Sequence, residues 1–127
     1  MVVLGGTSGE RAISNESGEA CAEALRKKKY SVSLFDPKFE NFNLIKKNST
    51  DVIFNALHGK DGEDGIAQSY FEYLRIPYTH SGVISSYNSM NKVISKEIFT
   101  KNKILTPKYF ILDKNTFHSN SLKKDLK

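Results

Sequence analysis

Two glycine-rich segments of the chain carry ionisable residues that could bind a small charged substrate. The first segment, residues 5–9, is followed at once by Glu10, whose carboxylate could hold a small cation such as an amino group. The second begins at His58, and a histidine at the end of a strand can bind an anionic substrate or stabilise developing charge. Each residue also has a plainer interpretation: Glu10 as a solvated acid favoured by a helix dipole, and His58 as a side chain that bonds a backbone carbonyl. From the residues alone, the plainer interpretation of Glu10 is preferred.

The spacing of the same residues excludes several common sites. The first glycine segment lacks the Lys-Ser/Thr ending of a P-loop and does not match the dinucleotide fingerprint. Asp61, Glu63 and Asp64 do not have the spacing of an EF-hand, so Glu63 and Asp64 are expected to fix their loop and start the next helix. The single cysteine, Cys21, is too few for an internal disulfide or a structural zinc site. We therefore predict no metal site.

Short apolar runs alternate with segments of helical spacing, which indicates a parallel sheet with helices on both faces. The predicted strands lie near residues 2–4, 31–35, 52–56 and 77–79, and the predicted helices over residues 14–28, 66–74 and 85–101. Ser14 is the expected N-cap of the first helix. A weak helix or turn is expected over residues 40–47, and an extended segment over residues 104–112. The fold class is thus a doubly wound α/β sheet, with the first strand between the second and the third.

This fold would bring the two glycine-rich segments together. Ligands of doubly wound sheets bind outside the carboxyl ends of the strands, and each segment follows a strand. Glu10 and His58 are therefore expected to face a common cleft, although 48 positions separate them.

Composition sets the class of protein. The chain has 127 residues, of which 39% are hydrophobic and 26% charged, as in one ordinary domain. It has no apolar run long enough to span a membrane and no signal peptide, so we expect a soluble cytoplasmic protein. The net charge is +5, but the basic residues are 16 lysines, scattered along the chain, and only 3 arginines. Proteins that recognise nucleic-acid bases and phosphates favour arginine, so no nucleic-acid partner is predicted. No membrane partner is predicted either.

Several blocks of sequence resemble one enzyme family in their order and spacing. Residues 4–14, Leu-Gly-Gly-Thr-Ser-Gly-Glu-Arg-Ala-Ile-Ser, closely resemble the opening motif of D-alanine–D-alanine ligases. The other matching blocks are Ala56-Leu57-His58-Gly59, Gly62-Glu63-Asp64-Gly65 with Gln68, Ile76-Pro77-Tyr78-Thr79 with Ser81-Gly82-Val83, Met90-Asn91-Lys92 and Thr106-Pro107. Together they cover residues 1 to about 112. Departures from the family pattern occur at Ser69, His80 and Asn91.

The resemblance implies a fold and a domain organisation. Members of the family have an amino-terminal Rossmann-like domain, which precedes the two lobes of an ATP-grasp. Residues 1–103 would be the Rossmann-like substrate domain, and residues 104–127 the start of the central lobe. The rest of the ATP-grasp is missing from these 127 residues. The residues from about Asp113 onward are expected to be poorly packed.

The resemblance also implies an activity. The family uses ATP and Mg²⁺ to join two D-alanines through an acyl phosphate, for peptidoglycan precursor synthesis and hence cell shape. Its implied partners are D-alanine, ATP and a second copy of the full-length enzyme. The residues that bind magnesium, and most of the nucleotide pocket, lie downstream in the family. The 127-residue chain alone is therefore expected to be inactive.

Three site residues carry over by position. Glu10 matches the glutamate that anchors and orients the ammonium of the first D-alanine. His58 matches the histidine near the carboxylate of that substrate and the acyl phosphate. Lys92 matches a lysine that contacts the nucleotide at the lobe boundary. Two alternatives remain open: a ligase of the same family that joins D-alanine to D-lactate or D-serine, and a non-catalytic binding module or truncated fragment.

Overall fold

The chain divides into two compact units. The computed structural model describes residues 1–46 and 49–112. The first unit spans Met1–Lys92 and the second Val93–Lys127. The predicted domain boundary at residues 103 and 104 stays a prediction. The expectation that the segment from Asp113 is poorly packed lies outside the described residues.

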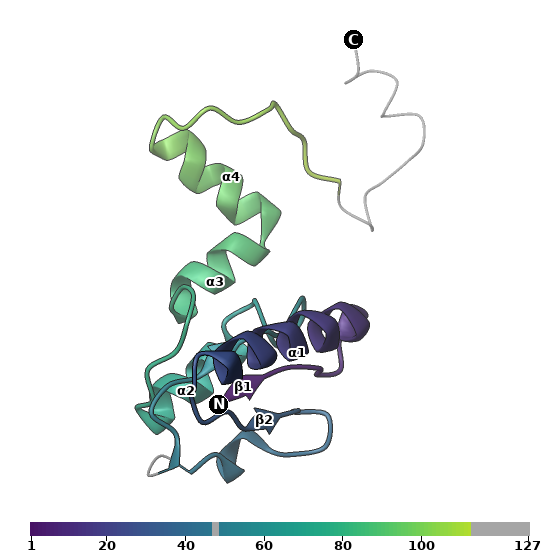
Figure 1. Cartoon of the computed structure of the whole chain (residues 1–127). Coiled ribbons are helices and arrows are strands. Elements are labelled where there is room, and N and C mark those ends of the chain that lie inside the picture. The colour runs from purple at the N-terminus through teal and green to yellow at the C-terminus, as the bar shows by residue number, and fades with distance from the viewer. Residues whose placement is uncertain (47–48, 113–127) are drawn as a thin grey trace. The chain divides into compact units, whose positions relative to one another are not determined.

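A parallel sheet of three short strands forms the centre of the first unit (Figure 1). β1 (Val2–Val3) lies between β2 (Leu34–Phe35) and β3 (Phe54–Asn55), and both neighbours run parallel to it. The register pairs Val2 with Leu34 on one side and with Phe54 on the other. This is the predicted strand order, with the first strand in the middle.

The predicted fourth strand is reduced to one isolated bridge between Ile53 and Tyr78. Two hydrogen bonds support it, from Ile53 N to Pro77 O at 2.8 Å and from Thr79 N to Ile53 O at 3.0 Å. Pro77 has no N–H to donate, so a longer ladder cannot continue through that position. The prediction was thus right about the parallel direction, and wrong about a full strand.

The helices follow the predicted pattern, with two corrections. The first unit contains α1 (Arg11–Lys27), the short 3₁₀ turn η1 (Phe42–Leu44), α2 (Ile66–Leu74) and α3 (Val83–Met90). α1 begins three residues before Ser14, so the prediction of Ser14 as N-cap was wrong. The single helix predicted over residues 85–101 is two helices, because Asn91 has an extended backbone with ψ 107° between α3 and α4 (Lys92–Lys101).

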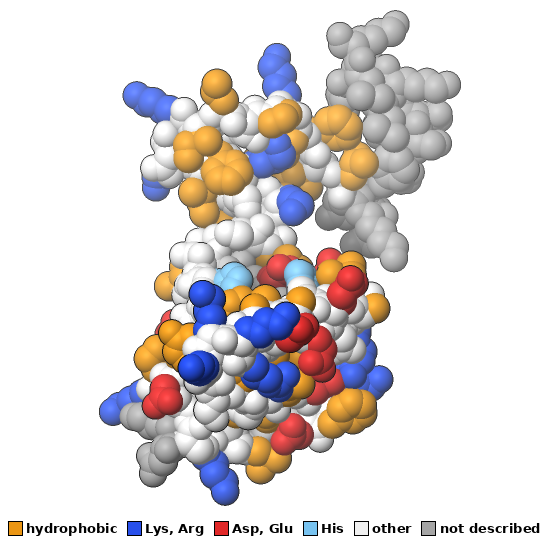
Figure 2. Space-filling view, in the orientation of Figure 1, with side chains coloured by type: hydrophobic (Ala, Val, Ile, Leu, Met, Phe, Trp, Pro, Cys, Tyr) orange, Lys and Arg blue, Asp and Glu red, His pale blue; other side chains and the backbone are white. Residues whose placement is uncertain are grey.

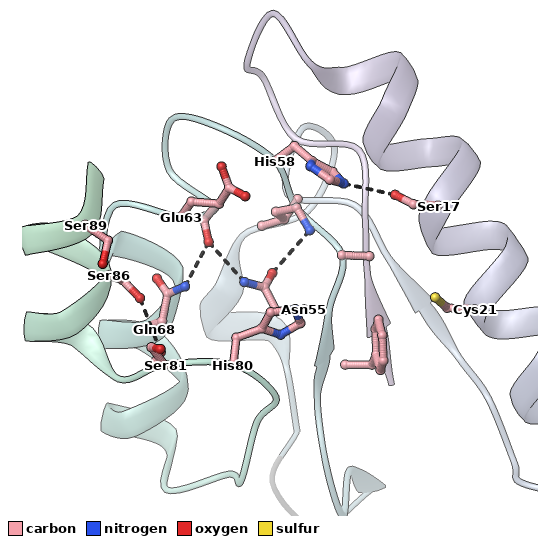
Figure 3. A pocket seen from close by; sticks show the side chains of 14 residues that line it. Ser17, Cys21, Asn55, His58, Glu63, Gln68, His80, Ser81, Ser86 and Ser89 are labelled. Carbon is pink, nitrogen blue, oxygen red and sulfur yellow. Dashed lines mark hydrogen bonds between the residues drawn. The ribbon is translucent and has the colours of Figure 1, made fainter. Parts of the chain in front are cut away.

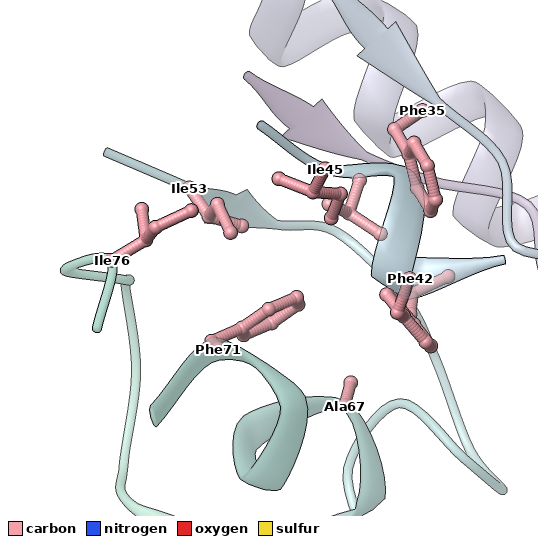
Figure 4. Packing of buried hydrophobic residues seen from close by; sticks show 9 residues of the cluster. Phe35, Phe42, Ile45, Ile53, Ala67, Phe71 and Ile76 are labelled. Carbon is pink, nitrogen blue, oxygen red and sulfur yellow. The ribbon is translucent and has the colours of Figure 1, made fainter. Parts of the chain in front are cut away.

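Apolar side chains bury both faces of the sheet. On one face Ala22 of α1 packs with Val2, Leu4 and Ala56. Gly18 lets α1 approach β1, because a β carbon there would stand 2.5 Å from the Leu4 side chain. The other face carries the larger cluster, in which α2 and η1 cover the strands (Figure 4) and whose members are Val3, Phe35, Phe42, Ile45, Ile53, Leu57, Ala67, Phe71 and Ile76. Helices on both faces confirm the doubly wound class.

The second unit consists of α4 and the segment that follows it. Lys96 of α4 donates to Thr106 Oγ1 at 2.9 Å and to Pro107 O at 3.0 Å, and its ammonium lies 5.1 Å from the ring centroid of Tyr109. These contacts hold the segment 104–109 along the helix without helical or strand structure. No helix in the described part of the chain is long and apolar enough to cross a membrane.

Candidate functional site

The loop after β1 turns sharply on two glycines. Gly5 and Gly6 have φ angles of +81° and +72°, which favour glycine. A β carbon on Gly5 would stand 2.5 Å from a carboxylate oxygen of Asp36, so the loop also needs glycine for space. The N–H of Gly6 donates to Asp36 Oδ1 at 2.9 Å. The loop is therefore fastened to the end of β2.

An ion pair completes that attachment. The guanidinium of Arg11 donates to both carboxylate oxygens of Asp36, at 3.1 and 2.6 Å, and to the carbonyl oxygen of Gly6 at 2.7 Å. Partial burial disfavours the ionised carboxyl of Asp36, but hydrogen bonds from Arg11 and from the N–H groups of Lys38 and Gly6 outweigh it, so the pKa of Asp36 is lowered. Asp36 is not among the site residues predicted from the sequence.

Ser14 connects three elements from inside α1. Its side chain is fully buried, and its Oγ accepts from Gly5 N at 2.8 Å and donates to Ala56 O at 2.7 Å. The hydroxyl thus ties the ends of β1 and β3 to the helix. This use of the hydroxyl is why Ser14 sits within the helix instead of capping it. The sequence gives no signal of this use, because the bond to Ala56 joins residues 42 positions apart.

The loop after β3 is fixed by its own acidic residues, as predicted. Glu63 Oε2 accepts from Gly59 N at 2.8 Å. Asp64 accepts from Asp61 N at 2.9 Å and from Ile66 N, the first residue of α2, at 3.2 Å. Glu63 and Asp64 therefore hold the turn and start the helix.

Two buried amide side chains donate hydrogen bonds to the backbone of the same loop. Asn55 of β3 and Gln68 of α2 both donate to the carbonyl oxygen of Gly62, at 3.0 and 2.8 Å (Figure 3). Asn55 Oδ1 also accepts from Leu57 N at 3.3 Å. These bonds hold the backbone of the loop close to the sheet, and sequence reasoning did not predict them.

The two loops meet through Ser8 and Gly59. Ser8 Oγ donates to His58 O at 2.7 Å and accepts from Glu10 N at 3.2 Å. The Glu10 carboxylate lies against Gly59, on the side where any other residue would carry its β carbon. Gly59 has a φ of +68°, which favours glycine, and a β carbon there would force the Glu10 carboxylate to move. Glu10 thus lies beside the residue that follows His58.

His58 is half-buried, and its ring points toward α1. Its Nε2 lies 3.1 Å from Ser17 Oγ (Figure 3). The residue borders two cavities. One, of about 360 Å³, is lined by residues of α1, β3, α2 and α3, among them Ser17, Phe54 and Gln68. The other, of about 290 Å³, is lined mainly by the two loops. A substrate contact shared by Glu10 and His58 stays a prediction.

Lys92 is exposed at the start of α4. Among residues 1–46 and 49–112, no group of three or more His, Cys, Asp or Glu side chains could hold a metal ion. Basic and acidic side chains lie next to one another on the face of the first unit that Figure 2 shows.

Comparison with known proteins gives a consistent result. Residues 34–81 match the family model described as "D-ala D-ala ligase N-terminus". A D-alanine–D-alanine ligase of Pelagibacter ubique is 51% identical over 109 residues, which are 86% of this chain and 36% of that protein. A ligase of the same name from Cereibacter sphaeroides is 44% identical over 113 residues, or 84% of this chain and 37% of that protein. The chain therefore spans just over a third of the length of the curated relatives it matches.

Solved structures agree with the sequences. The chain is similar to a D-alanine–D-alanine ligase from Bacillus anthracis, with a TM-score of 0.79 and 36% identity over 97% of this chain and 41% of that one. The complex of the same enzyme with ATP gives a TM-score of 0.81, again at 36% identity and 97% coverage of this chain, and 43% of that one. The chain and these structures therefore share a fold.

Proposed function

Since the chain belongs to the D-alanine–D-alanine ligase family and matches its amino-terminal domain, we propose that it supplies the first-substrate site of an ATP-dependent ligase that joins two D-alanines. The observation that carries the proposal is the junction of the two loops, where Ser8 links the backbone of Glu10 to that of His58. Both residues match family positions at which the first D-alanine is bound. The matched relatives named above are D-alanine–D-alanine ligases, which disfavours D-lactate or D-serine as the second substrate.

Glu10 is suited to hold an ammonium group. Its side chain is exposed at the position just before α1, while its backbone N–H is fixed by Ser8. Its carboxylate bonds to no group of the described residues and lies over Gly59, so it is free to pair with an amino group. A charge-assisted hydrogen bond of this kind orients the amino acid as well as binding it.

His58 is suited to the other end of the substrate. The residue follows β3 and borders both cavities, and Ser8, which links it to Glu10, lines the second cavity. We propose that the carboxylate of a substrate whose ammonium pairs with Glu10 lies toward His58. In the proposed reaction that carboxylate becomes an acyl phosphate, and an imidazolium positioned there can donate a hydrogen bond to its oxygens and stabilise the charge that develops on them. The contribution of the chain is thus to bind and orient the first substrate.

Few residues of this chain are proposed to bind the nucleotide or the metal. ATP would supply the phosphoryl group, and Lys92 is the residue proposed to contact it. The described residues contain no group of three or more His, Cys, Asp or Glu side chains that could hold a metal ion, and in the family the residues that bind magnesium lie downstream. We propose that ATP and Mg²⁺ are bound mainly by the downstream lobes of the full-length enzyme. We also propose that this enzyme is a cytoplasmic dimer, and that it acts in peptidoglycan synthesis and hence in cell shape.

The test is D-alanine-dependent release of phosphate from ATP by the chain extended downstream through the ATP-grasp lobes. Glu10→Gln should lower kcat/KM for D-alanine by about 10²-fold, since it removes a charge-assisted hydrogen bond to the ammonium. Glu16→Gln, an exposed glutamate of α1, is the matched control and should leave the activity unchanged. No phosphate release from the extended chain would refute the proposed function. Activity with D-lactate or D-serine alone as acceptor would reassign the second substrate.

A further inference from the structure

The two ring nitrogens of His58 have different surroundings. Nε2 lies 3.1 Å from Ser17 Oγ on α1 (Figure 3). The same hydroxyl oxygen lies 2.8 Å from the carbonyl oxygen of Ile13, four residues earlier in the helix. Among the described residues, no group bonds to Nδ1, the other ring nitrogen. The contact with Ser17 is therefore the one that distinguishes the two ring nitrogens among the described residues.

The direction of each hydrogen bond follows from the chemistry of the partners. A carbonyl oxygen only accepts, so the contact between Ser17 Oγ and Ile13 O uses the single proton of the hydroxyl. The Ser17 oxygen is then left with lone pairs toward Nε2, and Nε2 must be the donor. In the opposite arrangement two oxygen atoms would face each other at 2.8 Å with no proton between them. The second carbonyl near the hydroxyl, that of Ser14, is at 3.4 Å and is a poor substitute.

We propose that Ser17 is a positioning residue that holds the neutral ring of His58 as the Nε2–H tautomer, so that Nδ1 is the nitrogen that meets the substrate. The role toward substrate rests on the proposed function, whereas the tautomer rests on the geometry alone. A neutral ring of this kind presents a lone pair and accepts from an N–H group. A contact with a carboxylate or an acyl phosphate requires the imidazolium form, in which Nδ1–H donates.

Nitrogen NMR of the ¹⁵N-labelled 127-residue chain tests the proposal without ATP or D-alanine. The chain has three histidines, and His58→Gln identifies the signals of this ring. At a pH at which the rings are neutral, a long-range ¹H–¹⁵N correlation spectrum should show Nε2 of His58 as a protonated nitrogen and Nδ1 as an unprotonated one. Ser17→Ala removes the acceptor, so the ratio of the two tautomers should fall roughly fivefold to tenfold, and both nitrogen shifts should move toward their average.

Ser17→Thr keeps a hydroxyl at the same position of α1 and should restore the shifts of the unaltered chain. A backbone amide spectrum shows for each variant that the fold is retained. A signal from Nδ1–H in the unaltered chain would overturn the proposal, as would unchanged nitrogen shifts in a folded Ser17→Ala variant. Because no substrate is used, the result is independent of the phosphate-release assay. A failed assay would remove the proposed substrate role and leave the tautomer assignment in place.

Discussion

The carboxylate of Glu10 lies over the α carbon of Gly59, in the space that a side chain at position 59 would fill. The two residues belong to loops that follow different strands, and 49 positions separate them in the sequence. Gly59 lies in a loop, outside any strand or helix. Its conformation is therefore set by the contact between the two loops and by the hydrogen bond from its N–H to Glu63. The shape of the site next to His58 thus depends on a residue that has no side chain.

Gly59→Ala should destabilise the chain and displace Glu10. Its φ of +68° costs an L-residue about 1–2 kcal/mol, and the new methyl group would collide with the Glu10 carboxylate. The free energy of unfolding in urea should fall by at least that amount. The control is Gly9→Ala, because a β carbon there has no atom within 4 Å; it should leave stability unchanged or raise it by up to about 1 kcal/mol. Equal effects of the two substitutions would contradict this account of Gly59.

Asp36 should make stability depend on pH in the acid range. Its pKa is lowered in the folded chain, so its ionised form stabilises the fold above the pKa of an unfolded aspartate, about 3.9. That stabilisation is lost as the pH falls from about 4 through the lowered folded value. Asp36→Asn should therefore be less stable than the unaltered chain at pH 7, and the difference should shrink below pH 4.

Urea unfolding at a series of pH values measures this effect. Glu19→Gln, an exposed carboxylate on α1, is the control and should behave like the unaltered chain throughout. A stability difference for Asp36→Asn that stays constant between pH 7 and pH 3 would show that the pair with Arg11 does not act through charge.

Ser14→Ala should cost about 1–3 kcal/mol, since it leaves the buried N–H of Gly5 and the carbonyl of Ala56 without their hydroxyl partner. Ser69→Ala is matched to it, because the exposed Ser69 hydroxyl bonds only to the carbonyl four residues earlier in its own helix, at 2.7 Å. That control should change the free energy of unfolding by less than about 0.5 kcal/mol. Loss of protection from hydrogen exchange at Gly5 N in the Ser14 variant alone would locate the effect.

The sequence predicts those parts of the fold that depend on apolar periodicity. Val2-Val3-Leu4 is a continuous apolar run, and the burial of all three side chains could be inferred from residue type. In the second apolar run, Ile53 is fully buried and Phe54 lies in the neighbouring parallel strand, but Val52 is 50% exposed. The helix over residues 66–74 follows from amphipathic spacing and from Asp64 before it. In these cases local preference and long-range packing favour the same structure.

The parts that sequence reasoning missed depend on polar contacts between distant residues. Ser14 has the residue type of an N-cap, and only the carbonyl of Ala56, 42 positions away, shows that its hydroxyl is used elsewhere. Asp36 precedes a proline and resembles any strand end until Arg11 and Gly6 are brought to it. No glycine or proline marks the break at Asn91 between α3 and α4. Such contacts are set by the tertiary fold and leave no periodic signal.

The 127-residue chain by itself should show no ligase turnover. The proposed reaction needs ATP held in line with the carboxylate of the first D-alanine, and positioning of the reactants supplies much of the rate. Lys92 is the single residue proposed to contact ATP, and the described residues have no ligand cluster for Mg²⁺. Glu10 and His58 could hold one small amino acid on an open surface, which corresponds to a Kd in the millimolar range or weaker.

D-Alanine at tens of millimolar should then shift the amide signals of residues 8–10 and 58–59 of the 127-residue chain. Glu10→Gln should abolish that shift, and Glu16→Gln should keep it. Phosphate release from ATP should be absent from the short chain and present in the extended one. Turnover by the short chain would show that these residues suffice for catalysis, and that the downstream lobes are not needed to bring ATP to the substrate.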